Sequence, residues 1–354
     1  MARALSLSRH FKTRLASPFA ALLQTQLQTW RPSRSFDQSI FCLVVERSYY
    51  EYSPEPFHPL RGRTPIWKSA DEAVQIIESG MKVYVHSAAA TPTPLVEAMA
   101  RWGKTANLKN VEVIHIHTDG PLPHVGEEYE GLVNPQCPRT HGPGGIHQSH
   151  LDCLTVADFP LHEHKPGVIS DADRQIGKLI AENLVDNGAT LQMGIGTIPD
   201  ASLAELANHK DLGIHSEMFS DGVVDLVETG AITNEKKKIL PGRIVSSFVI
   251  GTKKAFDFID NNPFVIMMDV GFVNRVSISS LNPKVTAINS CIEVDLTGQV
   301  VSDSIGTKMY SGVGGQIDFL RSAALGFDGL GKPILAINSV TSKGQSKIVP
   351  FIKE

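Results

Sequence analysis

The sequence lacks a long hydrophobic run, a strong net charge and a dense set of cysteines. None of its 354 residues lie in a stretch approaching the roughly 20 apolar residues of a membrane-spanning helix, so we expect no membrane partner. The net charge of -4 gives no field that would draw the protein to nucleic acid. Four widely spaced cysteines indicate a reduced intracellular protein, not a disulfide scaffold. Aromatic residues are sparse, whereas glycine and proline are plentiful, a mix that suits an α/β protein with many tight turns.

Acidic residues are absent from the first 36 positions. Basic residues recur there instead, with serine and leucine between them: Arg3, Arg9, Lys12, Arg14, Arg31 and Arg34. This composition is typical of a mitochondrial transit peptide. We therefore expect residues 1–50 to be a disordered targeting segment and the mature protein to lie in the mitochondrial matrix. The alternative is a disordered basic tail with no targeting function.

Residues 51–165 begin with a regular α/β pattern. Ser69 and Glu72 have the spacing of a capping box, which predicts a helix that ends at Gly80. Strands are expected at 81–86 and 111–116, with a helix between them that follows Thr91 to Pro94. From 121 to 165 the periodicity fails, and a structureless run of that length is unusual inside a compact domain.

Residues 166–354 restore the alternation of helix and strand, so we place a domain boundary near Pro166. Ser170 starts a helix that Gly188 closes. The following elements are then expected: strands at 190–193, 213–217, 246–250, 264–268, 285–288, 291–296 and 333–337, and helices at 221–229, 254–260 and 315–325. Pro199 suits the first position of a further helix, and Asp221 suits an N-cap. The pattern predicts an α/β fold of two domains whose parallel or mixed sheets are flanked by helices.

Two glycine-rich turns each precede a predicted helix. Gly194-Ile195-Gly196 follows a strand, and Ser311 to Gln316 opens the helix at 315–325. Such loops let a backbone approach an anionic ligand at a helix N-terminus, although a plain strand–helix turn has the same pattern. The third glycine and the distant acid of a dinucleotide fingerprint are missing after Gly196.

Glu217 lies at the C-terminal tip of the strand predicted at 213–217, just before a helix. Ligands of α/β sheets bind outside such strand ends, so a carboxylate there could act as a nucleophile or a base. The alternative is a surface acid.

Cysteines and histidines gather where the periodicity fails: Cys137, His141, His147, His150, Cys153, His162 and His164. Their spacing matches no standard zinc pattern, so we expect no metal and interpret the segment as a histidine-rich loop. The chain also has no Gly-x-Ser-x-Gly elbow and no Walker lysine, which leaves an α/β-hydrolase or a P-loop NTPase unsupported.

Several long motifs resemble the acetyl-CoA hydrolase / 4-hydroxybutyrate CoA-transferase family, from about residue 54 onward. They lie at residues 62–74, 90–99, 137–142, 146–152, 191–201 (Leu-Gln-Met-Gly-Ile-Gly-Thr-Ile-Pro-Asp-Ala), 215–226 (His-Ser-Glu-Met-Phe-Ser-Asp-Gly-Val-Val-Asp-Leu) and 303–319 (Asp-Ser-Ile-Gly-Thr-Lys-Met-Tyr-Ser-Gly-Val-Gly-Gly-Gln-Ile-Asp-Phe). The last three motifs are the most specific.

The resemblance implies an acyl-CoA:carboxylate CoA-transferase in which Glu217 is acylated and then carries CoA as a thioester. It implies CoA contacts for seven further residues: Gly194, Ile195, Gly196, Thr197, Ile198, Ile292 and Gly315. Backbone N–H groups of the 194–197 loop would stabilise oxyanions, with the Gly314–Gly315 loop as a second candidate. No cofactor is expected beyond CoA as a substrate. Acetate, 4-hydroxybutyrate, butyrate or succinate would be the carboxylate partner, and a homodimer stays open.

The chain departs from the family in two places. The family has several tens of residues between the regions matching Tyr129 to Gly131 and Val133 to Pro135, which are almost joined here, and it continues beyond Ile352. We therefore expect a first domain that lacks an internal segment and a second that lacks its end. Two alternatives follow: an acetyl-CoA hydrolase with the same site, or a non-catalytic remnant that binds CoA weakly, pairs with a complete subunit or fails to fold.

Overall fold

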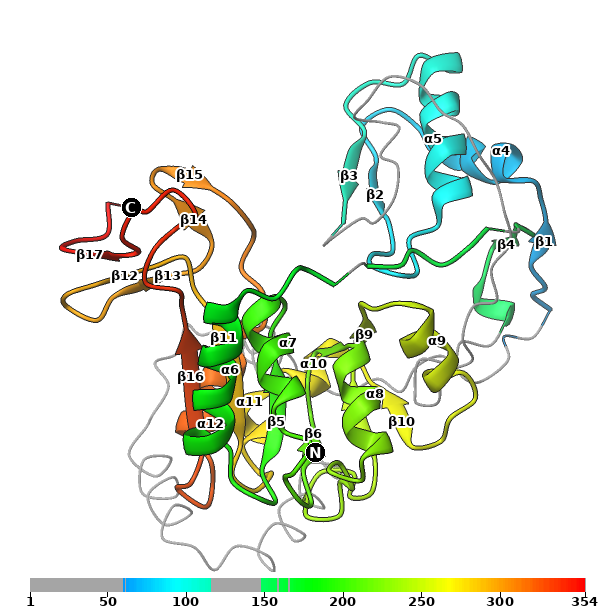
Figure 1. The fold of residues 1–354 in the computed structure, drawn as a ribbon. Helices are drawn as coiled ribbons and strands as arrows, with labels where there is room; N and C mark the ends of the chain where they lie inside the picture. Colours follow the sequence, from blue (N-terminus) through cyan, green and yellow to red (C-terminus); the bar gives the residue numbers. More distant parts are fainter. Residues whose placement is uncertain (1–59, 61, 116–147, 158, 165, 354) are drawn as a thin grey trace, which may run out of the picture. The chain divides into compact units, whose positions relative to one another are not determined.

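The structure is a computed structural model that describes residues 60, 62–115, 148–157, 159–164 and 166–353 (Figure 1). The first 59 residues and most of the histidine-rich stretch therefore lie outside it, together with the expected transit peptide. Within the described ranges no helix is both long and apolar enough to cross a membrane.

A parallel sheet forms the centre of the C-terminal part. Its four hydrogen-bonded strands run in the order β16 (Lys332–Ala336), β11 (Thr286–Ser290), β5 (Thr190–Met193) and β6 (Gly213–Ile214). A parallel bridge between His215 and Val245 links the β6 side to β8 (Ile244–Ser246), which pairs in parallel with β10 (Val265–Met267). The α/β prediction with parallel sheets is confirmed.

Helices cover both faces of this sheet, and the side chains of β11 show how. Ile288 joins the core cluster that includes residues of α6 (Asp171–Leu184), α7 (Thr197–Ala204), α8 (Asp221–Glu228) and α9 (Lys253–Ile259). Its neighbour Ala287 joins the cluster with α10 (Val270–Val273) and α12 (Gln316–Ala324), next to α11 (Val276–Ser279). Successive strand residues point to opposite faces, so two apolar neighbours in β11 require a helix layer on each side. Figure 1 shows α6, α7 and α8 side by side on one of these faces.

Short strands complete the C-terminal part. β7 (Met218–Phe219) pairs in parallel with β9 (Phe248–Val249). A three-stranded sheet joins β13 (Val300–Val301), β12 (Glu293–Asp295) and β17 (Ile348–Val349), and β14 (Ser304–Ile305) forms an antiparallel pair with β15 (Lys308–Met309). Along the chain, the segment from β12 to β15 connects the central strand β11 to the start of α12.

The N-terminal part has its own small core. It comprises β1 (Ile66–Trp67), α4 (Ala70–Ala73), the 3-10 helix η1 (Val74–Ile76), β2 (Lys82–Tyr84), α5 (Thr93–Thr105), β3 (Glu112–Ile114), the 3-10 helix η2 (Gln148–His150) and β4 (Cys153–Leu154). β2 and β3 are parallel, and Val85 and Val96 pack in a cluster with Val74. The Ser69 capping box is confirmed, with Glu72 accepting from the Ser69 amide at 2.9 Å. The domain boundary near Pro166 stays a prediction.

Several local predictions were wrong. The helices expected to end at Gly80 and Gly188 end earlier, at Ile76 in a 3-10 turn and at Leu184. The strand at 213–217 is divided, because the chain leaves β5 after Ile214 and pairs with β9 from Met218. Pro199 is the third residue of α7, not the first; the first turn of a helix has no intrahelical acceptor for its N–H groups, so proline fits there too. Asp221 does not cap its own helix: its carboxylate accepts from the amides of Thr252 and Ala255 and so caps α9.

Candidate active site

The backbone of Glu217 is fixed where the chain changes partner strand. Its carbonyl oxygen accepts hydrogen bonds from the amides of Ser247 at 2.9 Å and Phe248 at 3.1 Å, and from the Ser246 hydroxyl at 3.1 Å. All three donors lie at the C-terminal end of β8 or the start of β9. Glu217 is therefore anchored at the carboxyl edge of the sheet, where the sequence placed it.

The side chain of Glu217 is half-buried and held by two donors. The Asn274 amide and the Gly315 backbone N–H both hydrogen-bond to its carboxylate. Burial raises the pKa of Glu217, the two hydrogen bonds oppose that rise, and the negative charge of Asp318 adds to it. A desolvated but hydrogen-bonded carboxylate is a stronger nucleophile than a solvated one, which argues against the surface-acid interpretation.

Gly315 approaches Glu217 so closely that any side chain at this position would displace the Glu217 carboxylate. A Cβ atom built on its backbone would overlap Oε2 of Glu217 and Nδ2 of Asn274. Gly315 is itself buried and immediately precedes α12, so the helix N-terminus also faces the carboxylate. The structure thus brings the second glycine-rich loop to Glu217, as the sequence indicated.

Asn274 is the residue of this site that sequence reasoning missed. It follows the last residue of α10, a four-residue helix that the sequence did not predict. Its Oδ1 is buried and has no hydrogen-bond partner in the part of the chain that the structure describes. The hydrogen bond of this side chain is the one that it donates to the Glu217 carboxylate. Asp269, which caps α10 through the Gly271 amide at 2.8 Å, was an available signal of a helix start just before it.

The first glycine loop joins β5 to α7. The Gly194 amide donates to the Ile288 carbonyl at 2.8 Å, and Gly196 has φ +129, a conformation that L side chains rarely adopt. Ile195 is exposed, whereas the side chain of Ile198 is buried in the core. Thr197, between them, begins α7, so a ligand at this loop would meet its backbone amides and the helix N-terminus.

Ser216 connects this loop with the glutamate. Its hydroxyl accepts from the Met193 amide at 3.2 Å and donates to the Met193 carbonyl at 3.3 Å. Met193 directly precedes Gly194, and Ser216 directly precedes Glu217. The two motifs are therefore held together at one sheet edge by a buried serine.

Ile292 follows β11 by two residues. Its amide donates to the Val301 carbonyl at 2.9 Å, and Ile288 of β11 lies opposite Met193 of β5. Because parallel strands end at a common edge, Ile292 and the 194–198 loop lie on the same side of the sheet. Contact between CoA and these residues stays a prediction.

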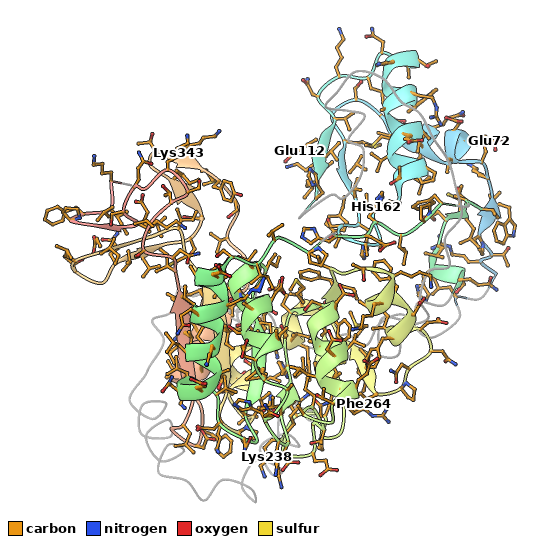
Figure 2. All side chains as sticks on the ribbon, viewed as in Figure 1. Glu72, Glu112, His162, Lys238, Phe264 and Lys343 are labelled. Carbon is orange, nitrogen blue, oxygen red and sulfur yellow. The ribbon has the colours of Figure 1, made fainter. Side chains whose placement is uncertain are left out.

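The cysteines and histidines of the candidate metal cluster are only partly described. Cys137, His141 and His147 lie outside the described residues. Among the residues that the structure describes, no group of three or more His, Cys, Asp or Glu side chains is placed to hold a metal ion. His162, labelled in Figure 2, instead pairs its Nε2 with the Thr93 hydroxyl at 2.7 Å.

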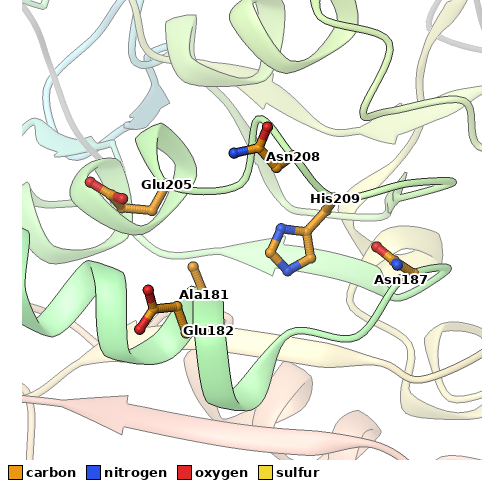
Figure 3. A pocket seen from close by; sticks show the side chains of 6 residues that line it. All are labelled: Ala181, Glu182, Asn187, Glu205, Asn208 and His209. Carbon is orange, nitrogen blue, oxygen red and sulfur yellow. The ribbon is translucent and has the colours of Figure 1, made fainter.

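A polar cavity of about 330 Å³ lies away from Glu217 (Figure 3). It is formed at the C-terminal ends of α6 and α7, which is the edge where β5 begins rather than ends. Figure 3 shows His209 between Asn187 and the acidic side chains of Glu182 and Glu205. Nε2 of His209 hydrogen-bonds to the Val185 carbonyl at 3.0 Å, which ties the turn after α7 to the end of α6. This cavity is not the candidate site.

Comparison with known proteins agrees with this geometry. Residues 251–354 match the model of the acetyl-CoA hydrolase/transferase C-terminal domain. A succinyl-CoA:acetate/propanoyl-CoA:succinate CoA transferase of Fasciola hepatica is 42% identical over 400 residues, covering 90% of this chain and 83% of the relative. That alignment is longer than the 354 residues of this chain, so the relative has internal residues with no counterpart here.

Two bacterial proteins extend the comparison. A 4-hydroxybutyrate coenzyme A transferase of Clostridium kluyveri is 50% identical over 221 residues, which is 62% of this chain and 51% of the relative. The chain thus matches about half the length of that protein. The crystal structure of a 4-hydroxybutyrate CoA-transferase from Porphyromonas gingivalis superimposes with a TM-score of 0.66 at 31% identity, covering 83% of this chain and 86% of that one. With its fold, its glutamate site and these relatives, the chain belongs to the acetyl-CoA hydrolase/CoA-transferase family.

Proposed function

We propose that this protein is an acyl-CoA:carboxylate CoA-transferase with Glu217 as its covalent nucleophile. The observation that carries the proposal is the Glu217 carboxylate, half-buried at a strand end and held by Asn274 and Gly315. Relatives are named for succinyl-CoA:acetate and 4-hydroxybutyrate transfer, so acetate, 4-hydroxybutyrate, butyrate and succinate are the carboxylates to test.

The chemistry needs neither a redox change nor a net proton transfer. The Glu217 carboxylate attacks the acyl-CoA carbonyl and the C–S bond breaks. CoA thiolate departs as the leaving group, and the product on the enzyme is an acyl-glutamyl anhydride. The thiolate then attacks the glutamyl carbonyl and expels the acyl group as a free carboxylate. A second carboxylate attacks the resulting glutamyl-CoA thioester and reverses the sequence, which yields the new acyl-CoA and restores Glu217.

Asn274 and Gly315 have a defined place in these steps. When thiolate adds to the glutamyl carbonyl, negative charge develops on a Glu217 oxygen, and both donors already face the Glu217 oxygens. Donors that need not move as charge develops lower the barrier without a reorganisation cost. The sequence had assigned the stabilisation of oxyanions to the amides of the 194–197 loop, with the Gly314–Gly315 loop as a second candidate. The 194–197 loop is the proposed binding site for CoA, together with Ile292, and its amides remain candidates for the oxyanion of the acyl group.

Borohydride trapping tests the proposal. The protein is incubated with an acyl-CoA and then reduced, which converts a glutamyl thioester to an alcohol that mass spectrometry locates. We expect the mark on Glu217 and its loss in Glu217→Gln, because an amide cannot form the anhydride. A mark elsewhere, or transfer that survives in Glu217→Gln, would refute the nucleophile. A folded wild-type protein with no mark would favour the non-catalytic remnant.

Water as the acceptor is the second candidate function, since the matched family model also covers acetyl-CoA hydrolases. The same acyl-enzyme steps then end in hydrolysis. Measuring CoA release with and without added acetate or succinate separates the two: a transferase forms a new acyl-CoA only with the carboxylate.

We also propose that the protein acts in the mitochondrial matrix. The support is the segment 1–36, which carries arginines and no acidic residue. Fusing residues 1–50 to a fluorescent protein should direct it to mitochondria, and the same fusion with its arginines changed to glutamate should not. A diffuse cytosolic signal from the unchanged fusion would contradict this localisation.

A further inference from the structure

His215 is buried two residues before Glu217 and its ring has a single arrangement of protons. Its Nε2 lies 2.9 Å from the carbonyl oxygen of Val273, which can only accept, so Nε2 carries the proton. Nδ1 then accepts from the Asn282 amide at 3.4 Å. The Asn282 amide cannot turn around without loss, because its Oδ1 accepts from the backbone amides of Lys238 and Ile239 at 3.2 and 3.1 Å.

The acceptor of this ring is next to a residue of the candidate site. Val273 is the last residue of α10, whose final carbonyls have no partner within the helix, and Asn274 is the residue after it. Asn274 reaches back to the Glu217 carboxylate. His215 and Glu217 therefore bind two consecutive residues of another segment. His215 contacts Val273, and Glu217 contacts Asn274.

We propose that His215 is a positioning residue that holds the Val273–Asn274 peptide so that the Asn274 amide meets the Glu217 carboxylate. The inference rests on the proposed function only in so far as Glu217 is the reacting group. His215 does not touch the carboxylate itself; it acts through the peptide bond of α10's last residue.

Charge and burial keep the ring suited to this task. Burial lowers the pKa of His215 to about 4, and the nearby Lys237 ammonium adds to the lowering. The Val273 hydrogen bond favours the charged ring but does not overcome these effects. The charged group that faces Glu217 is Asp318, on α12. At neutral pH the ring is therefore an uncharged donor with a fixed direction.

The test measures the Glu217 carboxylate itself, in the full chain, by its reaction with a water-soluble carbodiimide at a series of pH values. Mass spectrometry of the Glu217 peptide gives the midpoint pH of the modification. Losing the Asn274 hydrogen bond favours the neutral acid, so Asn274→Ala should raise the midpoint by about one pH unit. His215→Phe should raise it similarly, and His215→Phe combined with Asn274→Ala should raise it no further.

His215→Gln is the matched rescue, because its amide nitrogen can replace Nε2 as the donor to Val273 and should restore the wild-type midpoint. His215→Asn is too short to do so and carries the test if His215→Phe fails to fold. A wild-type midpoint in folded His215→Phe or His215→Asn would overturn the inference. Transfer activity distinguishes this failure from that of the proposed function: persistent transfer in Glu217→Gln refutes the nucleophile, whatever the midpoints.

Discussion

The backbone N–H of Gly315 donates a hydrogen bond to the carboxylate of Glu217. The two residues belong to motifs that are far apart in the sequence, a glycine-rich helix start and a strand end. Each would be unremarkable alone. Together they place a half-buried carboxylate at the N-terminus of α12, where the helix dipole favours negative charge.

Gly315→Ala should lower the rates of transfer and of borohydride-trappable thioester formation on the order of a hundredfold while leaving most of the fold in place. The added Cβ would occupy the space of Glu217 Oε2 and Asn274 Nδ2, so both must move, and displacement of about 1 Å can cost on the order of a hundredfold in rate. Gly312→Ala is the control, because its Cβ meets nothing within 4 Å. Equal activity in Gly315→Ala and the wild type would show that this contact does not serve the reaction.

Gly196→Ala tests the first glycine loop without a steric clash. A Cβ there has nothing within 4 Å, but φ is +129, so alanine strains the backbone by roughly 1–3 kcal/mol. We expect the loop to relax and CoA to bind about tenfold more weakly or worse in calorimetric titration. Gly103→Ala, at an open site inside α5 with ordinary φ, should leave CoA binding unchanged. Unaltered affinity in Gly196→Ala would remove the loop from the CoA site.

Lys237 predicts an unusual alkaline stabilisation. Its ammonium is buried and donates to the carbonyls of Ile214 at 2.7 Å and Arg243 at 2.6 Å, and burial lowers its pKa to about 7. Between pH 7 and the ordinary lysine pKa, the unfolded chain binds the proton more tightly, so the free energy of unfolding rises with pH, approaching about 1.4 kcal/mol per pH unit. The gain should be lost as pH falls to 7.

Denaturant unfolding at several pH values checks this expectation. Lys237→Met should flatten the rise between pH 7 and 10. Lys238→Met, at the neighbouring exposed residue labelled in Figure 2, should keep it. Parallel pH curves for the wild type and Lys237→Met would be inconsistent with a depressed lysine pKa.

Asp221→Ala should destabilise the protein by about 1–2 kcal/mol, the usual cost of losing a helix cap. Its carboxylate accepts from the Thr252 amide at 2.9 Å, the Thr252 hydroxyl at 2.8 Å and the Ala255 amide at 3.1 Å at the start of α9. Asp225→Ala, which removes an exposed ion pair with Lys254, should change the free energy of unfolding by less than about 0.5 kcal/mol. Equal effects of the two substitutions would contradict the cap.

Much of the fold followed from local patterns. The capping box at Ser69 and the helix start at Ser170 form as expected, and Ser170 also forms a box with Asp173, because the partners of each box lie within one helical turn. The short strand expected at 190–193 is the buried strand β5, and the helix expected at 315–325 is α12 with its ends shifted by one residue. The helix and its caps follow from local spacing because residues within one or two turns supply their hydrogen bonds, whereas β5 takes its hydrogen bonds from β11 and β6 and only its short extent was predicted.

The break after Ile214 could not be found in this way. Gly213 to Glu217 is consistent with one strand, but pairing with β9 begins at Met218, and β9 is contributed by residues distant in the sequence. Asp221 likewise serves α9 and not its own helix, because its carboxylate accepts from the amides of Thr252 and Ala255. Strand exchange and distant capping leave no periodic signal.

The sequence by itself determined the α/β class, the two glycine loops and the choice of Glu217, because short-range spacing and specific motifs carry them. Only the tertiary structure decided what surrounds that glutamate: the Asn274 donor from an unpredicted helix, the Ser216 link to Met193 and the His215 contact with Val273. The physical reason is that hydrogen bonds between distant segments depend on which strands and helices pack together, and packing is a property of the whole core rather than of any local stretch.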